Sequence, residues 1–203
     1  LYGEPGTGKS HALQLAVRHL RCGGSSKVAV VSAYGLVALQ VHGCTLHSWA
    51  GIGKEDVGSP DDGKTLSAEL FAKHIQKNCA RAAARWKAVE WLAIDEASLV
   101  SAELFDVLEE VAQRIRGNDT FFGGIRLLLA FDFWQLFPVS TAARPRKPLF
   151  LSVHWQRLVD NGLCVELTAQ HRHPGDGELL QILRAARHNR FTPQHPLWGV
   201  YSP

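Results

Sequence analysis

The sequence contains no methionine and only four cysteines among its 203 residues. The cysteines are far apart, none forms a CxxC pair, and none lies in a His/Cys cluster at the spacing of metal ligands. This usage excludes a disulfide-rich secreted domain and argues against a zinc site. We therefore expect reduced cysteines and an intracellular protein. The residues are Cys22, Cys44, Cys79 and Cys164.

The sequence also lacks any apolar run as long as a membrane span, which favours a soluble protein with no membrane partner. It lacks a strong charge bias as well. The net charge of +3 and the pI near 8.8 permit a nucleic-acid partner without pointing to one. Because it begins at Leu1, two residues before a glycine-rich motif, we expect one domain over residues 1–203, truncated at both ends, with any targeting signal outside it.

Short apolar runs alternate with longer amphipathic segments, the pattern of an α/β fold. The runs are nearly continuous, as in strands covered on both faces of a parallel sheet. We predict a mainly parallel sheet with helices on both faces. The predicted strands are Val28–Ser32, Val89–Ile94, Ile125–Phe131 and Leu163–Leu167, with Leu1–Tyr2 as the end of a further strand.

Helical periodicity is clearest in Ala102–Arg116, with Ser101 as N-cap and Gly117 at its end. Its predicted inward residues are Leu104, Phe105, Leu108, Val111, Ala112 and Ile115. Other predicted helices are Ser10–Arg21, one between Thr65 and Ala88 with Leu66, Leu70, Cys79 and Trp86 toward the core, and Asp176–Asn189 with Leu179, Leu180, Leu183 and Ala186 inward. Surface loops are predicted over Gly53–Thr65 and Ser140–Pro148.

Residues 3–10 read GEPGTGKS and match the phosphate-binding motif GxxxxGKS/T in full. In this motif the backbone amides fold around phosphates, Lys9 reaches the β- and γ-phosphates, and the Ser10 hydroxyl ligates Mg²⁺. A chance glycine-rich turn is the alternative. A strand before the motif and an amphipathic helix after it favour a nucleotide site. The predicted binding residues are Gly3, Gly6, Thr7, Gly8, Lys9 and Ser10.

A second apolar strand, starting near Trp91, ends in Asp95 and Glu96. In P-loop proteins an acid at this place holds Mg²⁺, and an adjacent acid polarises the attacking water. Alone the pair is weak, because acids are common at helix starts. A third strand leads to Asp132 and then Gln135. Gln135 either contacts the γ-phosphate or is an ordinary polar residue of a turn.

The order of these segments resembles the PIF-type DNA helicases, a RecD-related branch of superfamily 1 that moves 5′ to 3′ on single-stranded DNA. The segments are GEPGTGKS, SAYGLVALQVHGCTLHSWAGIG, LAIDEASL, GGIRLLLAFDFWQLFPV and ELTAQHR. The likeness extends from about Leu1 to Arg190, and TLHSWAGIG and DFxQLxPV are its most distinctive parts. It implies the first RecA-like motor domain of a helicase, an ATP hydrolase that uses ATP and Mg²⁺.

The resemblance also implies roles for matching residues. Ser10 and Asp95 hold Mg²⁺, Glu96 is the general base, Gln135 senses the γ-phosphate, and Arg172 supplies positive charge to the transition state, beside Lys9. The implied DNA-contacting residues are Thr45, His47 and Ser48.

Single-stranded DNA, or DNA with a 5′ tail, and a second RecA-like domain of the same protein are the implied partners. Without that domain we expect the 203-residue chain not to unwind DNA. The family places such proteins in the nucleus or mitochondrion, in DNA repair, recombination and telomere maintenance.

The chain departs from the family pattern at Phe131, where relatives carry glycine, and at Tyr34, Phe137 and His173. A bulky residue at 131 threatens a close backbone approach, so a weakened enzyme is one reading. Two alternatives stay open: another P-loop ATPase, such as a clamp-loader-like or transposition ATPase, and a nucleic-acid-binding module that has lost turnover.

Basic residues recur every four positions between Thr65 and Ala88, either along a DNA path or, as we favour, on a solvated helix face. They are Lys73, Lys77, Arg81 and Arg85. Trp49 lies in the DNA-facing motif, where base stacking is conceivable and a core ring is favoured.

Overall fold

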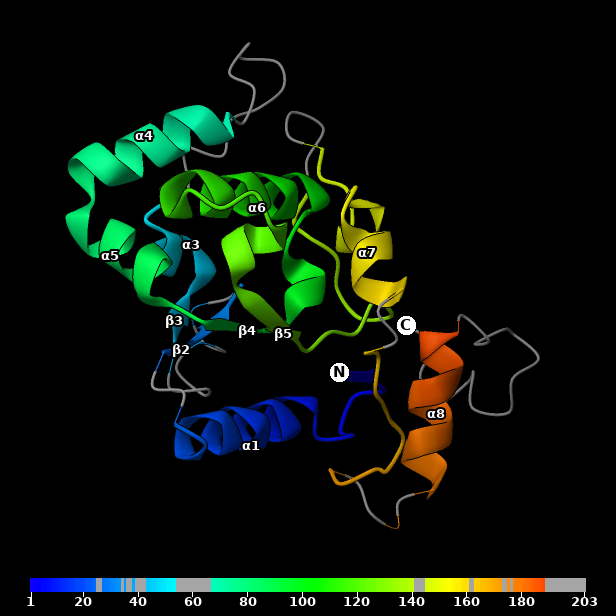
Figure 1. Ribbon diagram of the computed structural model, residues 1–203. Helices are drawn as coiled ribbons and strands as arrows, with labels where there is room; N and C mark the ends of the chain where they lie inside the picture. The colour runs from blue at the N-terminus through cyan, green and yellow to red at the C-terminus, as the bar shows by residue number, and fades with distance from the viewer. Residues whose placement is uncertain are drawn as a thin grey trace.

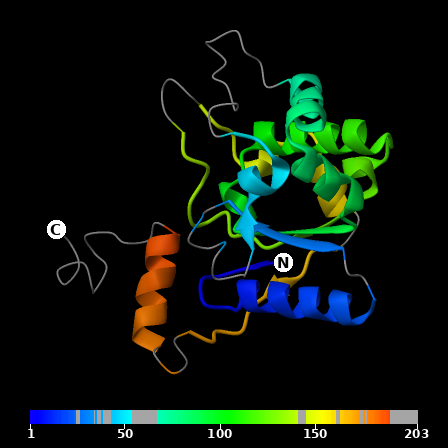
Figure 2. The ribbon, with the colours of Figure 1, turned by 90° about the vertical axis from the view of Figure 1, so that its left-hand side faces the viewer.

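The computed structural model describes residues 1–24, 27–33, 35, 38, 43–53, 67–140, 145–160, 163–172, 175 and 177–188. Within these residues a parallel sheet lies between helices on both faces (Figures 1 and 2). The predicted α/β class is therefore confirmed. One face carries helix α1 (Lys9–Cys22), and the other carries α3 (Leu46–Ala50), α4 (Ala68–Asn78), α5 (Ala80–Ala88) and α6 (Ala102–Arg116).

The sheet has the order β3-β2-β4-β5, with all neighbours parallel. Its strands are β2 (Val28–Ser32), β3 (Cys44–Thr45), β4 (Trp91–Asp95) and β5 (Arg126–Leu129). A second parallel pair consists of β1 (Tyr2–Gly3) and β6 (Glu166–Leu167). A parallel bridge between Tyr2 and Phe131 joins the two sheets. Because the strands are parallel, their carboxyl ends meet at one edge, where ligand sites of such sheets form.

Helix α6 has the predicted bounds and caps. The Ser101 hydroxyl accepts the Leu104 amide at 3.2 Å, and Gly117 ends the helix in the left-handed region with φ 61. All six predicted inward residues are buried, and the Phe105 ring packs against Phe122 with centroids 5.0 Å apart. Burial of each large apolar side chain contributes about 1.5–3 kcal/mol, so this face fixes α6 on the sheet.

Strand β4 connects the two layers of the core. Leu92 and Ile94 belong to the large apolar cluster under α3 to α6, whereas Ala93 packs with Leu13 and Val17 of α1. This alternation is the two-residue period of a strand that is covered on both faces.

The segment between residues 65 and 88 corrects a prediction. It contains two helices, because Cys79 leaves the helical region with φ −125 and ψ 60. Because the break changes the helical phase at Cys79, residues on one face of the first helix do not continue onto the same face of the second. Trp86 is buried as predicted, but Leu70 is 67% exposed, and the prediction for Leu70 was wrong. Leu66 lies outside the described residues, as do most of the predicted loop over Gly53–Thr65 and residues 141–144 of the other loop.

Two further predictions were wrong in detail. Only Glu166 and Leu167 form a strand in the 163–167 run, where they pair with β1, and Leu163 is 80% exposed. In α8 (Gly177–Arg187) Ala185 is buried, whereas Leu183 is 44% exposed. Ala186 is exposed as well, and the predicted ends Asp176 and Asn189 lie outside the described residues.

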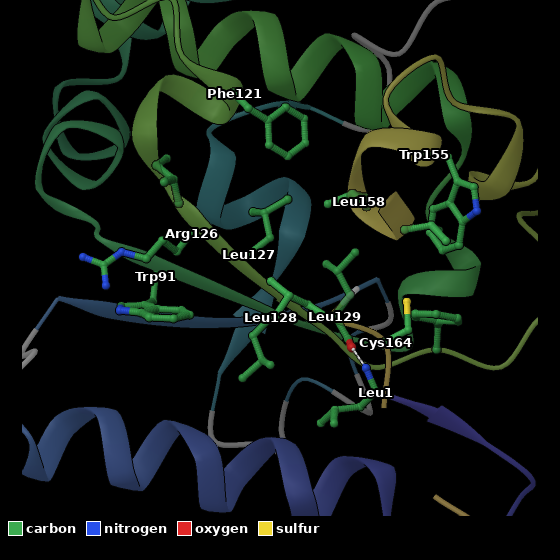
Figure 3. Close-up of a pocket in the computed structure, with 14 residues that line it drawn as sticks. Leu1, Trp91, Phe121, Arg126, Leu127, Leu128, Leu129, Trp155, Leu158 and Cys164 are labelled. Carbon is green, nitrogen blue, oxygen red and sulfur yellow. Dashed lines mark hydrogen bonds between the residues drawn. The ribbon is translucent and has the colours of Figure 1, made fainter. Parts of the chain in front are cut away.

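An apolar cavity of about 370 Å³ lies beside β5 and is lined in part by α7 (Trp155–Asp160) and by the 3₁₀ turn η3 (Phe121–Gly124) (Figure 3). The other 3₁₀ turns are η2 (Ala97–Leu99) and η4 (Leu149–Leu151). Phe131, Trp155 and Leu158 line the cavity. All four cysteines are free thiols. None of the helices in the described part of the chain has the length and apolar character to cross a membrane.

Candidate active site

The GEPGTGKS segment forms the turn between β1 and α1. Gly6 and Gly8 both have φ 84, a conformation that side-chain-bearing residues rarely adopt. Gly8 is the N-cap of α1, and no side chain caps this end of the helix. The first backbone amides and the positive end of the helix dipole are therefore directed at the turn, which suits an anion.

Lys9 begins α1 and is buried in the turn. Its Nζ donates to the Gly3 carbonyl at 2.9 Å and to the Glu4 carbonyl at 3.1 Å, and it lies 3.7 Å from Asp132 Oδ2. Burial lowers the pKa of Lys9, against the opposing pull of Asp132 and Glu96. The ammonium is therefore positioned at the turn by two carbonyls, which a phosphate group can replace.

Asp95 and Glu96 form an acid pair at the end of β4. Asp95 is 1% exposed, and its Oδ1 accepts the Glu96 amide at 3.0 Å. Burial raises the pKa of Asp95, although the Ser10 hydroxyl lowers it by hydrogen bonding. Burial and then the neighbouring Asp95 raise the pKa of Glu96. Glu96 itself has φ 52, a backbone conformation that residues with side chains rarely adopt and that is often found at functional sites.

The acid pair and Ser10 fit a Mg²⁺ ion. Buried Asp95 Oδ2 has no hydrogen-bond partner among the described residues, which is unusual for a buried carboxylate. Ser10 lies within hydrogen-bonding reach of Asp95. Mg²⁺ takes oxygen ligands, and it usually binds through one or two carboxylates together with water and substrate phosphates.

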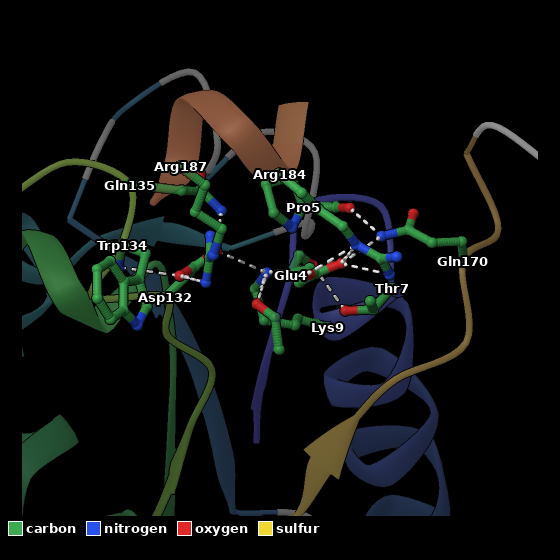
Figure 4. Close-up of polar contacts among 11 residues, drawn as sticks. Glu4, Pro5, Thr7, Lys9, Asp132, Trp134, Gln135, Gln170, Arg184 and Arg187 are labelled. Carbon is green, nitrogen blue, oxygen red and sulfur yellow. Dashed lines mark hydrogen bonds and ion pairs between the residues drawn. The ribbon is translucent and has the colours of Figure 1, made fainter. Parts of the chain in front are cut away.

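Asp132 anchors the residue that was predicted to sense phosphate. Its Oδ2 accepts the Gln135 side-chain amide at 2.7 Å, and its Oδ1 accepts the Trp134 backbone amide at 3.0 Å. Arg187 of α8 binds both carboxylate oxygens (Figure 4). Burial raises the pKa of Asp132, but the hydrogen bonds from Arg187 and Gln135 outweigh burial and leave the pKa below its ordinary value.

The AQHR segment crosses the phosphate-binding turn and brings Arg172 to it. The His171 amide donates to the Gly6 carbonyl at 2.9 Å, and the Gln170 side chain donates to the Pro5 carbonyl at 2.9 Å. A Cβ on Gly6 would lie 2.7 Å from Gln170 Oε1. This close approach explains why glycine is needed at position 6.

These segments enclose a cleft of about 430 Å³. The lining residues are Pro5, Gly6, Gly8, Lys9, Ser10, His11, Glu96, Gln135, His171 and Arg172. Five predicted catalytic or metal-binding side chains thus converge here from four separate segments. Asp95 lies beneath this surface. Gly3 and Thr7 do not line the cleft but belong to the turn that forms it. The backbone of Gly3 lies so close to β6 that a Cβ there would be 2.3 Å from the Leu167 carbonyl oxygen. The Thr7 hydroxyl donates to the Glu4 carbonyl at 2.8 Å within the turn.

Sequence reasoning missed three residues of this region. His11 and His171 line the cleft, and Arg187 pairs with Asp132. The positions of both histidines next to matched motifs, directly after Ser10 and directly before Arg172, were the available signal. Nothing in the local sequence around Arg187 marks its partner, which lies 55 residues away.

The predicted DNA-contacting residues lie at the same edge of the sheet, outside the cleft. Ser32 of β2 is in register with both Thr45 and Asp95. Neighbouring strands are about 4.8 Å apart, so the backbones of Thr45 and Asp95 are separated by about 10 Å. The Thr45 hydroxyl caps α3 by accepting the Ser48 amide at 3.2 Å.

The predicted basic row does not form one surface. Arg85 donates to the Ser48 and Trp49 carbonyls at 2.7–2.9 Å and is half-buried, so it holds α3 in place. Lys73 pairs with Glu69 at 2.6 Å, whereas Lys77 and Arg81 are exposed. Trp49 is 4% exposed and packs on Trp86 at 4.6 Å, which supports the core reading of this ring.

The bulky residue in the third motif packs among aromatic rings. The Phe131 ring lies 4.9 Å from Phe133, 5.4 Å from Trp155 and 6.0 Å from Tyr2. It lines the apolar cavity beside β5 and is not among the residues that line the phosphate cleft. The geometry therefore gives no support to a blocked site.

The parallel sheet, the phosphate-binding turn and the acid pair at the end of β4 define a P-loop protein of the RecA-like class. Comparison with known proteins then gives the family. The chain matches the PIF1-like helicase family over residues 1–179, and it belongs to that family.

Individual relatives agree with this assignment. The chain is 39% identical over 193 residues to the ATP-dependent DNA helicase RRM3 of Saccharomyces cerevisiae, an alignment that covers 94% of this chain and 25% of RRM3. The chain thus spans about a quarter of the length of the curated relatives it matches.

Solved structures show the same fold. The crystal structure of the Pif1 helicase from Candida albicans matches with a TM-score of 0.79 and 33% identity, over 92% of this chain and 39% of that chain. The Pif1 helicase from Bacteroides matches with a TM-score of 0.69 over 94% of this chain and 42% of that chain. Its 23% identity supports the fold alone.

Proposed function

We propose that this chain is the nucleotide-binding motor domain of an ATP-dependent DNA helicase, and that the cleft binds and hydrolyses ATP with Mg²⁺. The observation that carries the proposal is the convergence of Lys9, Ser10, Glu96, Gln135 and Arg172 on one cleft. Relatives named as ATP-dependent DNA helicases support it.

Each cleft residue has a role that its position suits. Lys9 exchanges its two carbonyl partners for the β- and γ-phosphates, and the uncapped start of α1 binds the same anion. Glu96 accepts a proton from the attacking water, a task for which a carboxylate with a raised pKa is suited. Gln135 contacts the γ-phosphate from its anchor on Asp132, and Arg172 stabilises the charge of the transition state.

Ser10 and Asp95 hold the Mg²⁺ ion in this proposal. The unpartnered Asp95 oxygen and the adjacent hydroxyl are the two protein ligands that fit. When bound, the ion neutralises charge on the β- and γ-phosphates.

Single-stranded DNA, or DNA with a 5′ tail, is the proposed nucleic-acid partner, and it binds along the edge that carries Thr45, His47 and Ser48. Thr45 ends β3 and is in register, through Ser32, with Asp95 at the end of β4. His47 and Ser48 follow it in α3. We propose that unwinding also requires a second RecA-like domain, because a single domain has no partner whose separation changes during the ATP cycle.

The test is a titration of a fluorescent ATP analogue with Mg²⁺. Lys9→Ala is expected to weaken binding at least tenfold without lowering the helical content, because the charge opposite the β- and γ-phosphates is lost. Lys27→Ala is the matched control, since Lys27 pairs with Glu90 at 3.4 Å on the surface, and it is expected to bind like the parent chain. Equal affinity in Lys9→Ala and the parent contradicts the proposed nucleotide site.

A further inference from the structure

Two arginines of helix α8 form ion pairs with the phosphate-binding region. Ala185 is the one buried residue of this helix. Arg184 pairs with Glu4 of the turn at 3.0 Å, and Arg187 pairs with Asp132 (Figure 4). These contacts join a segment near residue 187 to two motifs that precede it by 55 residues or more.

The Arg187–Asp132 pair has the geometry of a strong ion pair. Arg187 Nη1 donates to Asp132 Oδ2 at 2.8 Å, and Nη2 donates to Oδ1 at 2.6 Å. The two side chains are 12% and 1% exposed, so solvent screens the pair weakly. Because Asp132 is buried and ionised, removal of its guanidinium partner leaves a charge that needs another cation.

Lys9 is the other cation close to Asp132. Its ammonium lies 3.7 Å from Asp132 Oδ2, and Lys9 is one of the residues that line the cleft. Lys9, Asp132 and Arg187 together carry one net positive charge. Without Arg187 their sum is zero, and Asp132 competes with phosphate for Lys9.

We propose that Arg187 is a positioning residue for nucleotide binding: it neutralises Asp132, so that Lys9 stays available to phosphate. The inference rests on the proposed nucleotide site and adds a residue to it that lies outside the phosphate-binding motif. In this proposal α8 contributes to the charge balance of the cleft as well as to the packing of the fold.

The experiment measures binding of the fluorescent ATP analogue with Mg²⁺ to variants of the 203-residue chain. Arg187→Ala is expected to weaken binding at least tenfold. Addition of Asp132→Asn to Arg187→Ala removes the competing charge and is expected to restore affinity to within about threefold of the parent. Arg187→Lys keeps the positive charge without the two-pronged contact and is also expected to stay within about threefold. Arg114→Ala, which breaks an exposed pair with Glu110, is the control.

Two results overturn the inference. One is parental affinity in Arg187→Ala. The other is equally weak binding in Arg187→Ala and in the double variant, which is the pattern of a merely structural contact. If Arg187→Ala does not fold, Asp132→Asn alone decides the question. It is expected to bind at least as tightly as the parent, and a tenfold loss contradicts the proposal. Lys9→Ala distinguishes failure of the nucleotide site from failure of the role of Arg187. Unchanged binding in Lys9→Ala contradicts the nucleotide site itself. Lost binding in Lys9→Ala, with parental binding in Arg187→Ala, contradicts only the role of Arg187.

Discussion

The backbone amide of Glu96 donates to the Asp95 carboxylate at 3.0 Å, which fixes two carboxylates side by side at the end of β4. Burial raises the pKa of both groups, and the proximity of Asp95 adds to the shift of Glu96. In the absence of a cation this arrangement opposes folding, because two partly desolvated negative charges repel each other. The two carboxylates therefore lower the stability of the fold without a cation, and a bound cation can neutralise their charge.

The first prediction concerns pH. Since the folded-state pKa values of Asp95 and Glu96 are raised, the folded chain binds protons more readily than the unfolded chain. Their contribution to stability is therefore largest in acid, and it is lost as pH rises from about 4 through the raised values. Glu96→Gln is expected to have a higher Tm than the parent at pH 7.5 and the same Tm near pH 4, as measured by thermal unfolding.

Asp132→Asn is the opposite control in that experiment. The folded-state pKa of Asp132 is lowered, so its stabilising contribution is present at neutral pH and is lost as pH falls through the folded pKa. This variant is expected to be less stable than the parent at pH 7.5, by an amount that shrinks in acid. A constant difference in Tm across the pH range for both variants would refute the assigned shifts.

The second prediction separates binding from chemistry. In the intact protein Glu96→Gln is expected to bind ATP and to lose turnover by about two orders of magnitude or more, as for a lost general base. Asp95→Asn is expected to weaken the Mg²⁺ dependence and the binding together, because it alters the oxygen that lacks a partner. Steady-state ATPase rates at varied Mg²⁺ measure both. Near-normal turnover in Glu96→Gln would mean that another acidic residue is the general base. Asp132 is the next candidate by position, but the structure shows it occupied by Arg187 and Gln135.

The third prediction concerns Phe131, at the position where the family pattern implies glycine. The ring packs on Phe133, Trp155 and Tyr2 and is not among the residues that line the cleft. Phe131→Gly is expected to destabilise the fold by about 2–3 kcal/mol, below the range of roughly 3–5 kcal/mol for fully buried rings, without any gain in ATP turnover. Denaturant unfolding and ATPase assays test the two parts. A faster enzyme with unchanged stability would show that the ring obstructs the site.

The fourth prediction divides the basic row by function. Arg85→Lys keeps the charge and loses the fork that holds the Ser48 and Trp49 carbonyls. It is expected to destabilise the fold by about 1–3 kcal/mol, because these carbonyls lose their donor. Lys77→Ala with Arg81→Ala is expected to leave stability unchanged. Titration of single-stranded DNA at several salt concentrations then tests these two exposed residues, and a flatter salt dependence would contradict our view that they are merely solvated.

The sequence by itself determined the features that depend on local order. The phosphate-binding turn, the strand that ends in Asp95 and Glu96, and helix α6 with its caps at Ser101 and Gly117 were all predictable. In each case the backbone conformation and the side chains that produce it lie within a few residues of one another. The family resemblance added Arg172 and favoured the γ-phosphate reading of Gln135, and both residues line the cleft with Lys9.

Tertiary structure decided the relationships between distant residues. The break at Cys79 turned one predicted helix into two, and Arg85 became a clamp on α3 instead of a free cation. In α8, Arg184 and Arg187 bind carboxylates that lie 180 and 55 residues away. A periodic pattern records which face of a helix is apolar. It does not record which distant carboxylate a charged residue will meet, because that depends on how the completed sheet and its loops bring the segments together.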